Sequence, residues 1–325
     1  MILDALGPLP PYDLTDKREV RRVERMYDLH ARKSFSQHWL VDRAALDAIV
    51  TAAEITRAST ILEVGAGLGV LTAELGRRAG RVVAVEIERD VMPVLKTMTK
   101  DYPQVEIINS DLLKIDPATV FGDTPYTIAA NLPYAITAKA LRHFLEATHK
   151  PQRLVVLVQK EVAERITAKP GELSMLAISV QFYGTPRIIA AVPASSFFPP
   201  PKVDSAIIVI DVVPQELDPA VRDRLFALAK ATFAQRRKQL HNTMPGALHL
   251  STTQVHDWLA AVNISPERRP QTLSMAEWIA LAETDPRVKG YAHDEDGFYQ
   301  GLGVDAARHQ HIDDLAKNLP DDPDW

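Results

Sequence analysis

The sequence predicts an α/β fold in which a mostly parallel sheet, with an antiparallel edge strand, precedes a small all-helical domain. Three observations support this prediction. Up to Pro214, short apolar runs of strand length alternate with stretches of helical length. The runs are continuously apolar, which is typical of strands buried on both faces of a parallel sheet. After Pro214 the strand-like runs stop and only helical patterns remain.

The expected elements alternate along the chain. Strands are predicted at 60–64, 81–86, 105–109, 126–131, 153–158, 187–192 and 205–213. Helices are predicted at 70–79, 89–100, 137–147, 159–167 and 172–183. Asp42 can cap a further helix ahead of the first strand. A proline-bearing loop without a helix joins the last two strands, so we expect them to form an antiparallel pair at the sheet edge.

Changes in composition predict four regions. These are an N-terminal arm (1–30), the sheet domain (31–214), the helical domain (215–284) and an acidic tail (285–325) for which we expect partial disorder. Within the helical domain, Ser251 with Gln254 and Ser274 with Glu277 have the spacing of capping boxes.

Composition excludes several classes of protein. No stretch reaches the roughly 18 uncharged apolar residues of a membrane helix, and the N-terminus lacks the basic start of a secretion signal. The chain has no cysteine, which excludes disulfides, a thiolate nucleophile and a Cys-ligated zinc site. We therefore expect a cytoplasmic protein.

The net charge of −5 conceals an uneven distribution. Residues 283–325 carry 11 acidic and 4 basic side chains, so the rest of the chain is mildly basic. Residues 222–242 hold six basic side chains opposed only by Asp223. This basic stretch is a candidate contact for a nucleic-acid backbone.

A glycine-rich turn follows the first predicted strand of the sheet. It reads Glu63-Val-Gly65-Ala-Gly67-Leu-Gly69 and opens a helix. Glycines let the backbone approach a ligand closely at the carboxyl end of a parallel strand. The dinucleotide fingerprint would need glycine where Val70 stands, so the spacing favours a nucleoside over a pyrophosphate.

Polar residues also end the next three strands. Glu86 stands where a carboxylate can bind ribose hydroxyls, and Asp111 stands where one can accept from an adenine amino group. The fourth strand ends in Asn131-Leu132-Pro133-Tyr134. There an amide oxygen and a carbonyl directed by proline could hold an exocyclic amine, while tyrosine offers a stacking face.

These motifs together resemble the S-adenosylmethionine-dependent rRNA adenine-N6 dimethyltransferases, most closely the branch that dimethylates two adjacent adenines near the 3′ end of small-subunit (16S) rRNA. The resemblance extends from about residue 32 to 283. It also includes Gln37-His38-Trp39-Leu40, SSFFPPPKVDSA (195–206), FAQRRKQLHN (233–242) and RRPQTLS (268–274). It implies a Rossmann-like class I methyltransferase sheet.

The resemblance also implies residue roles. S-adenosylmethionine would be bound by Gln37, His38, Leu40, Glu63, Gly65, Gly67, Gly69, Glu86, Ile87, Asp111, Leu112 and Asn131. The target adenine would be held by Asn131 and the Leu132 carbonyl, with Pro133 shaping the turn and Tyr134 and Phe197 sandwiching the base. RNA would contact Arg222, Arg236, Arg237 and Lys238.

The first motif departs from the family pattern. Ser36 stands in place of the usual glycine and Trp39 in place of the usual phenylalanine. If that glycine served a positive φ angle, Ser36 would strain the turn over the cofactor.

The expected partners are small-subunit rRNA and the assembling 30S particle, with no membrane, no metal and a monomeric enzyme. Three alternatives stay open. They are a large-subunit (23S) rRNA adenine dimethyltransferase that gives macrolide resistance, a DNA adenine methyltransferase, and a non-catalytic ribosome-assembly or transcription factor with the same fold.

Overall fold

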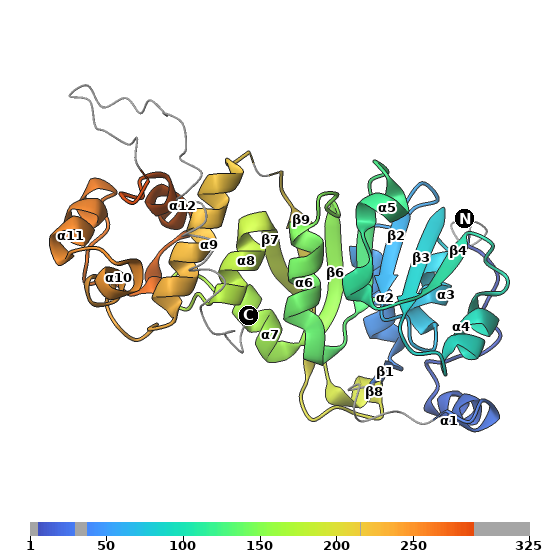
Figure 1. Cartoon of the computed structure of the whole chain (residues 1–325). Helices are drawn as coiled ribbons and strands as arrows, with labels where there is room; N and C mark the ends of the chain where they lie inside the picture. Colours follow the sequence, from blue (N-terminus) through green and yellow to red (C-terminus); the bar gives the residue numbers. More distant parts are fainter. Residues whose placement is uncertain (1–5, 30–37, 215, 289–325) are drawn as a thin grey trace. The chain divides into compact units, whose positions relative to one another are not determined.

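The computed structural model describes residues 6–29, 38–214 and 216–288, and it divides the chain into two units (Figure 1). The first comprises Met1–Thr167 and Tyr183–Val213, and the second comprises Ala168–Phe182 and Pro214–Trp325. The division differs from the predicted regions in two places. Residues 168–182 group with the helical unit, and the described part of the N-terminal arm belongs to the sheet unit.

The first unit is built on a seven-stranded sheet with the order β4-β3-β2-β5-β6-β9-β7. Its strands are β2 (Thr60–Val64), β3 (Arg81–Glu86), β4 (Val105–Asn109), β5 (Thr127–Asn131), β6 (Arg153–Gln159), β7 (Gly184–Val192) and β9 (Ser205–Val212). All the predicted strands form, with bounds that shift by at most three residues. β9 runs antiparallel to β6 on one side and to β7 at the edge on the other, which confirms the expected antiparallel pair.

Helices cover both faces of this sheet, as the continuously apolar strands predicted. Their bounds are α2 (Arg43–Ala52), α3 (Val70–Gly76), α4 (Met92–Thr99), α5 (Pro117–Phe121), α6 (Thr137–Glu146) and α7 (Lys160–Ile166), with 3-10 turns at η3 (Leu112–Lys114) and η4 (Tyr134–Ile136). Figure 1 shows α6 in front of the sheet and α2 and α3 behind it. The Asp42 side chain caps α2 by accepting from the N–H groups of Ala44 and Ala45.

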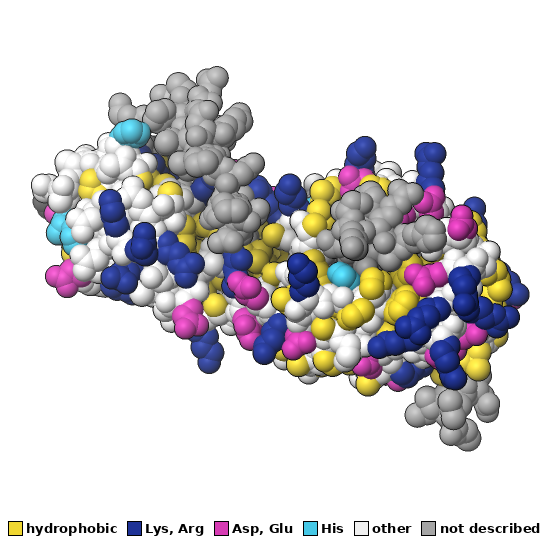
Figure 2. Space-filling model, turned by 90° about the horizontal axis from the view of Figure 1, so that it is seen from below, with side chains coloured by type: hydrophobic (Ala, Val, Ile, Leu, Met, Phe, Trp, Pro, Cys, Tyr) yellow, Lys and Arg dark blue, Asp and Glu magenta, His cyan; other side chains and the backbone are white. Residues whose placement is uncertain are grey.

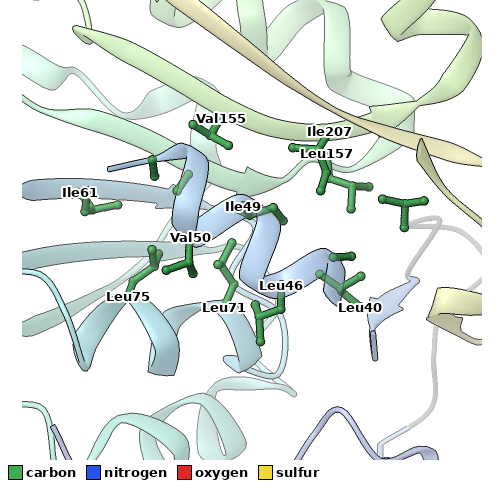
Figure 3. Packing of buried hydrophobic residues seen from close by; sticks show 14 of the residues in the cluster. Leu40, Leu46, Ile49, Val50, Ile61, Leu71, Leu75, Val155, Leu157 and Ile207 are labelled. Carbon is green, nitrogen blue, oxygen red and sulfur yellow. The ribbon is translucent and has the colours of Figure 1, made fainter. Parts of the chain in front are cut away.

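The core behind the sheet positions the ends of the central strands. Leu46 and Ile49 of α2 pack between the sheet and α3, beside Val155 of β6 and Leu75 of α3 (Figure 3). These side chains are buried, and burying an aliphatic side chain of this size stabilises the fold by about 1.5–3 kcal/mol. The sheet order reverses between β2 and β5, and open parallel sheets bind ligands at such a reversal.

Helix α5 falls where no helix was predicted. Two further elements of the sheet unit were not predicted with defined bounds. The first is helix α1 (Lys17–Met26), which the Asp16 side chain caps. The second is a two-stranded sheet in which β1 (Trp39–Leu40) pairs antiparallel with β8 (Phe197–Phe198), which follows η5 (Ala194–Ser196). Strands of two residues are too short to show a periodic pattern, so no local signal in the sequence predicts them.

The second unit is helical, as predicted. It contains α8 (Met175–Tyr183, whose last residue belongs to the sheet unit), α9 (Pro219–Phe233), α10 (Leu240–Leu248), α11 (Thr252–Ala261), η6 (Pro270–Thr272) and α12 (Met275–Glu283). Both predicted capping boxes are formed, at the starts of α11 and α12. Trp278 of α12 is almost fully buried.

Candidate active site

A cavity of about 370 Å³ opens at the carboxyl ends of β2, β3, β4 and β5. Its walls come from the four predicted strand-end motifs and from the segment just before α2. They are formed by His38, Trp39, Gly65, Gly67, Val85, Glu86, Ile87, Glu88, Ser110, Asp111, Leu112, Leu113, Asn131, Leu132, Pro133, Tyr134, Ala135 and Ile136. The structure thus brings together residues that are widely separated in the sequence.

The glycines of the turn after β2 have different functions. Gly65 and Gly67 line the cavity with φ angles of 78° and 54°, which favour glycine. A Cβ on Gly65 would lie 3.4 Å from Pro133 Cδ, so the turn fits closely against the motif after β5. Gly69 does not line the cavity. A Cβ there would lie 2.8 Å from Leu95 Cδ1, so Gly69 serves the packing of α3 against α4.

Glu86 ends β3 inside the cavity wall and is only 7% exposed. Its carboxylate accepts from the N–H of Gly67 at 2.7 Å and from the N–H of Glu88 at 2.8 Å. Burial raises the pKa of Glu86, while these backbone donors act in the opposite direction. Each oxygen retains a second lone pair, so the carboxylate can still accept from ligand hydroxyls.

Glu63 lies behind the turn and is 1% exposed. Burial, with the nearby charge of Glu86, raises the pKa of Glu63 to about 8. Its Oε2 has no hydrogen-bond partner in the described part of the chain, and neither has Trp39 Nε1. Both residues line a second, smaller cavity of about 40 Å³ beside Gly65 and Gly67. A buried carboxyl oxygen without a partner is costly, so this position suits a ligand that carries a hydrogen-bond donor.

Ile87, Asp111 and Leu112 line the side of the cavity beyond Glu86. One oxygen of Asp111 accepts from the N–H of Leu113 at 3.0 Å, which fixes the carboxylate at the start of η3. Leu112 is buried, whereas Ile87 is exposed at the rim. An apolar wall beside a fixed carboxylate suits a nucleobase with an amino group.

Asn131 stands at the centre of the site, at the end of β5. Its Nδ2 donates to the carbonyl of His38 at 3.2 Å. Asn131 lines the cavity, and no residue in the described ranges donates a hydrogen bond to its amide oxygen, which is therefore available as an acceptor. Leu132 precedes a proline, which favours an extended backbone and turns its carbonyl away from a helical hydrogen bond.

Tyr134 lines the same cavity. Its hydroxyl is 2.6 Å from Ser205 Oγ at the start of β9, and its ring stacks with that of His38 at a centroid distance of 5.8 Å. His38 Nδ1 donates to the carbonyl of Pro199 at 2.8 Å. The sequence analysis assigned Ser205 no role, although this residue lies within the motif SSFFPPPKVDSA (195–206). The contact holds the tyrosine ring in place at the cavity wall.

The segment before α2 also contains Ser36, Gln37, Trp39 and Leu40, which the sequence analysis singled out. Leu40 is buried in β1 and contacts only the smaller cavity, whereas Gln37 and Ser36 lie outside the described residues. Trp39 lies against Gly67, because a Cβ on that glycine would be 3.5 Å from Trp39 Cδ1. The larger indole thus forms part of the cavity wall.

Phe197 does not line the cavity. Its side chain is 0% exposed in the core cluster that includes Leu40 and Leu46, and Tyr134 packs against the same cluster. β8 pairs Phe197 with Leu40 and directs its ring inward. Of the two predicted stacking residues, Tyr134 borders the cavity and Phe197 does not.

The predicted RNA contacts lie in the helical unit. Arg236, Arg237 and Lys238 are exposed in the turn after α9. Arg222 is paired with Asp223 at 2.7 Å. Arg224, from the same basic stretch, is buried and donates to the carbonyl of Ala282 at 2.9 Å. The exposed cationic surface is therefore smaller than the composition of the stretch suggested.

Within 6–29, 38–214 and 216–288 no helix is long and apolar enough to cross a membrane. Across the same ranges no cluster of His, Asp and Glu is arranged to hold a metal ion.

Comparisons with known proteins agree with this geometry. A family model described as ribosomal RNA adenine dimethylase matches residues 28–281. The ribosomal RNA small subunit methyltransferase A of Dehalococcoides mccartyi strain CBDB1 is 46% identical over 266 residues, which cover 81% of this chain and 91% of that protein. The protein of that name from Clostridioides difficile strain 630 is 38% identical over 276 residues, covering 83% and 96%.

Two solved structures share the fold across most of the chain. A dimethyladenosine transferase from Plasmodium falciparum has a TM-score of 0.65 and 26% identity, covering 75% of this chain and 96% of that one. The 23S rRNA methyltransferase ErmE has a TM-score of 0.63 and 25% identity, covering 76% and 98%.

Proposed function

The chain belongs to the ribosomal RNA adenine dimethylase family, and on that premise we propose that it dimethylates N6 of two adjacent adenines near the 3′ end of small-subunit rRNA. The observation that carries the proposal is the orientation of Asn131. Its amide nitrogen is held by the His38 carbonyl, so its oxygen is presented to the cavity as an acceptor for an exocyclic amine.

The cavity fits S-adenosylmethionine, which would supply an activated methyl group when bound. Gly65 and Gly67 would let the protein backbone approach the cofactor closely, and the Glu86 carboxylate can accept from ribose hydroxyls. Asp111 with Leu112 and Ile87 would hold the adenine. The unpartnered oxygen of Glu63 beside the smaller cavity would accept a hydrogen bond from a donor group of the cofactor.

The protein's own contribution to the reaction is position and orientation. Asn131 Oδ1 and the Leu132 carbonyl would accept from the two N–H groups of the target amine, which turns its lone pair out of conjugation. Tyr134, held by Ser205, would stack on the base. Orientation of this kind can supply several kcal/mol, about 7–11 at the upper limit. The amine nitrogen attacks the methyl carbon as the bond from that carbon to the sulfonium sulfur breaks, and the sulfur keeps the electron pair. The methylated nitrogen is then positively charged and strongly acidic, and it loses its proton to solvent, so the site needs no potent general base.

The substrate must present an unpaired or flipped adenine, because a base within a duplex could not enter the cavity. Aromatic stacking on a flipped base contributes about 1–3 kcal/mol. Arg236, Arg237 and Lys238 would contact the RNA backbone from the helical unit. This exposed set is small, so we propose that the assembling 30S particle, rather than free RNA, is the substrate.

Transfer of labelled methyl groups to purified, unmethylated 30S and 50S particles tests the proposal. We expect dimethyladenosine on 30S particles only. Label on 50S particles would assign the protein to large-subunit methylation instead. Cofactor binding without transfer to either particle would indicate a non-catalytic assembly factor.

A further inference from the structure

Helix α1 is firmly attached to the sheet unit by one apolar face. Val20 and Val23 are 0% exposed and pack in a cluster with Leu14 and Trp39. Ahead of the helix, the Tyr102 hydroxyl donates to the carbonyl of Pro8 at 2.7 Å. The helix is therefore a fixed part of the surface.

The opposite face of α1 is strongly basic. At 100° per residue, Val20 and Val23 lie on one side, while Arg18, Arg21, Arg22 and Arg25 gather on the other and Lys17 lies at the flank between them. All five basic side chains are exposed. Only Glu19 and Glu24 oppose them within the helix, both at its flanks. Figure 2 shows Lys and Arg side chains gathered on the part of this face where α1 lies.

This arrangement is unfavourable for the helix alone. Lys17 with Arg21, Arg18 with Arg22, and Arg21 with Arg25 are like charges four residues apart, which destabilise a helix. Arg18 is paired with Asp16 and Arg22 with Glu19, yet their side chains remain 88% and 59% exposed. An anion bound along this face would remove the repulsion.

The basic face adjoins the wall of the cavity. Lys17 Nζ donates to the carbonyl of Ser195 at 2.8 Å, and the Arg21 guanidinium lies 5.1 Å from the centre of the Phe198 ring. Phe198 pairs with Trp39, which lines the cavity. One strand pair thus separates the basic face from the candidate site.

We propose that the basic face of α1 binds the phosphodiester backbone of the RNA strand next to the target adenine. This inference rests on the proposed function and adds an RNA-binding surface on the sheet unit itself. The family-model match begins at residue 28, so α1 precedes it. Regularly spaced phosphates complement a row of exposed arginines, and pairing of this kind makes binding strongly dependent on salt.

The test compares two variants with equal reduction of charge. Arg22→Gln with Arg25→Gln removes two cations from the basic face. Arg57→Gln with Lys100→Gln is the control, because both residues are exposed. They precede β2 and β4 and therefore lie at the amino ends of these strands, whereas the cavity lies at the carboxyl ends. Dissociation constants for unmethylated 30S particles are measured over a salt series, with cofactor binding and thermal unfolding measured in parallel.

We expect the α1 variant to bind particles about fivefold more weakly for each phosphate that it no longer neutralises, at about 0.1 M salt. Its log–log salt slope should be shallower by about 0.7–0.9 for each such phosphate, with cofactor affinity unchanged. The control variant should match the wild type. Equal salt slopes for the α1 variant and the wild type, or equally weakened binding in both variants, would overturn the inference.

The two proposals fail separately. If the wild-type protein forms no dimethyladenosine on 30S particles, the proposed function is refuted. If it does so while the α1 variant keeps the wild-type slope, only the role of α1 is refuted. Weaker binding without a change in slope would point to a protein partner on this face and would also contradict RNA binding there.

Discussion

Replacing Glu63 with glutamine should change how the stability of the sheet unit depends on pH. Glu63 is 1% exposed and its pKa is raised from 4.5 to about 8, chiefly by burial. Between these values the unfolded chain is ionised at this position, whereas the folded protein holds a proton. Folding then takes up a proton, so the free energy of unfolding falls as pH rises, by about 1.4 kcal/mol per pH unit.

Glutamine cannot ionise, so Glu63→Gln removes this contribution. From about pH 5.5 to about pH 7.5, the stability of the variant relative to the wild type should rise by about 2.7 kcal/mol. Glu86, whose pKa is also raised, is present in both proteins and contributes similarly to each. Glu106→Gln is the control, because that side chain is 57% exposed on strand β4 of the same sheet.

Urea unfolding read by pulsed hydrogen exchange of peptides from β2 and β3 reports on the sheet unit alone, which a global signal from two units would not do. Parallel pH profiles for the wild type and Glu63→Gln would show that Glu63 is ionised in the folded protein, contrary to this prediction. A change of the same size in Glu106→Gln would refute it too.

Further substitutions test single parts of the site. Asn131→Ala should lower methyl transfer about 10²–10³-fold, as removal of an oriented polar group commonly does, while cofactor binding measured by calorimetry stays near the wild-type value; an equal decrease in both would contradict the assigned role. Glu86→Gln should weaken cofactor binding about 10- to 100-fold, because a hydrogen bond to a charged group contributes about 1.5–3 kcal/mol; unchanged affinity in the same titration argues against ribose binding. Phe197→Ala should lower the free energy of unfolding by about 3–5 kcal/mol, and a decrease below about 1 kcal/mol would show that the ring is not a core residue. Gly69→Ala should destabilise the fold through its positive φ and its contact with Leu95, and a melting temperature equal to the wild-type value would exclude that strain.

The sheet and most of its ligand-facing residues could be predicted because they depend on local patterns. Continuously apolar runs between helices specify buried parallel strands, and parallel strands place their carboxyl ends at one edge. Glu86, Asp111 and Asn131 follow from that rule alone, since each stands where such a strand ends. Their common cavity confirms that they meet.

Other features depend on pairing between distant segments, which a local pattern does not reveal. The inward direction of Phe197 is set by its pairing with Leu40, more than 150 residues earlier in the chain. Gly69 stands in the glycine motif but serves helix packing, because its position relative to Leu95 is tertiary. The burial of Arg224 likewise follows from its contact with α12.

Methyl transfer to adenines of small-subunit rRNA through Asn131 can be measured by mass mapping of the 3′-terminal rRNA fragment. The fragment is taken from 30S particles that have been incubated with S-adenosylmethionine and either wild-type protein or Asn131→Ala. We expect dimethyladenosine at two adjacent positions with the wild type and unmodified adenines with the variant. Unmodified RNA in both samples, or equal modification in both, would contradict this expectation.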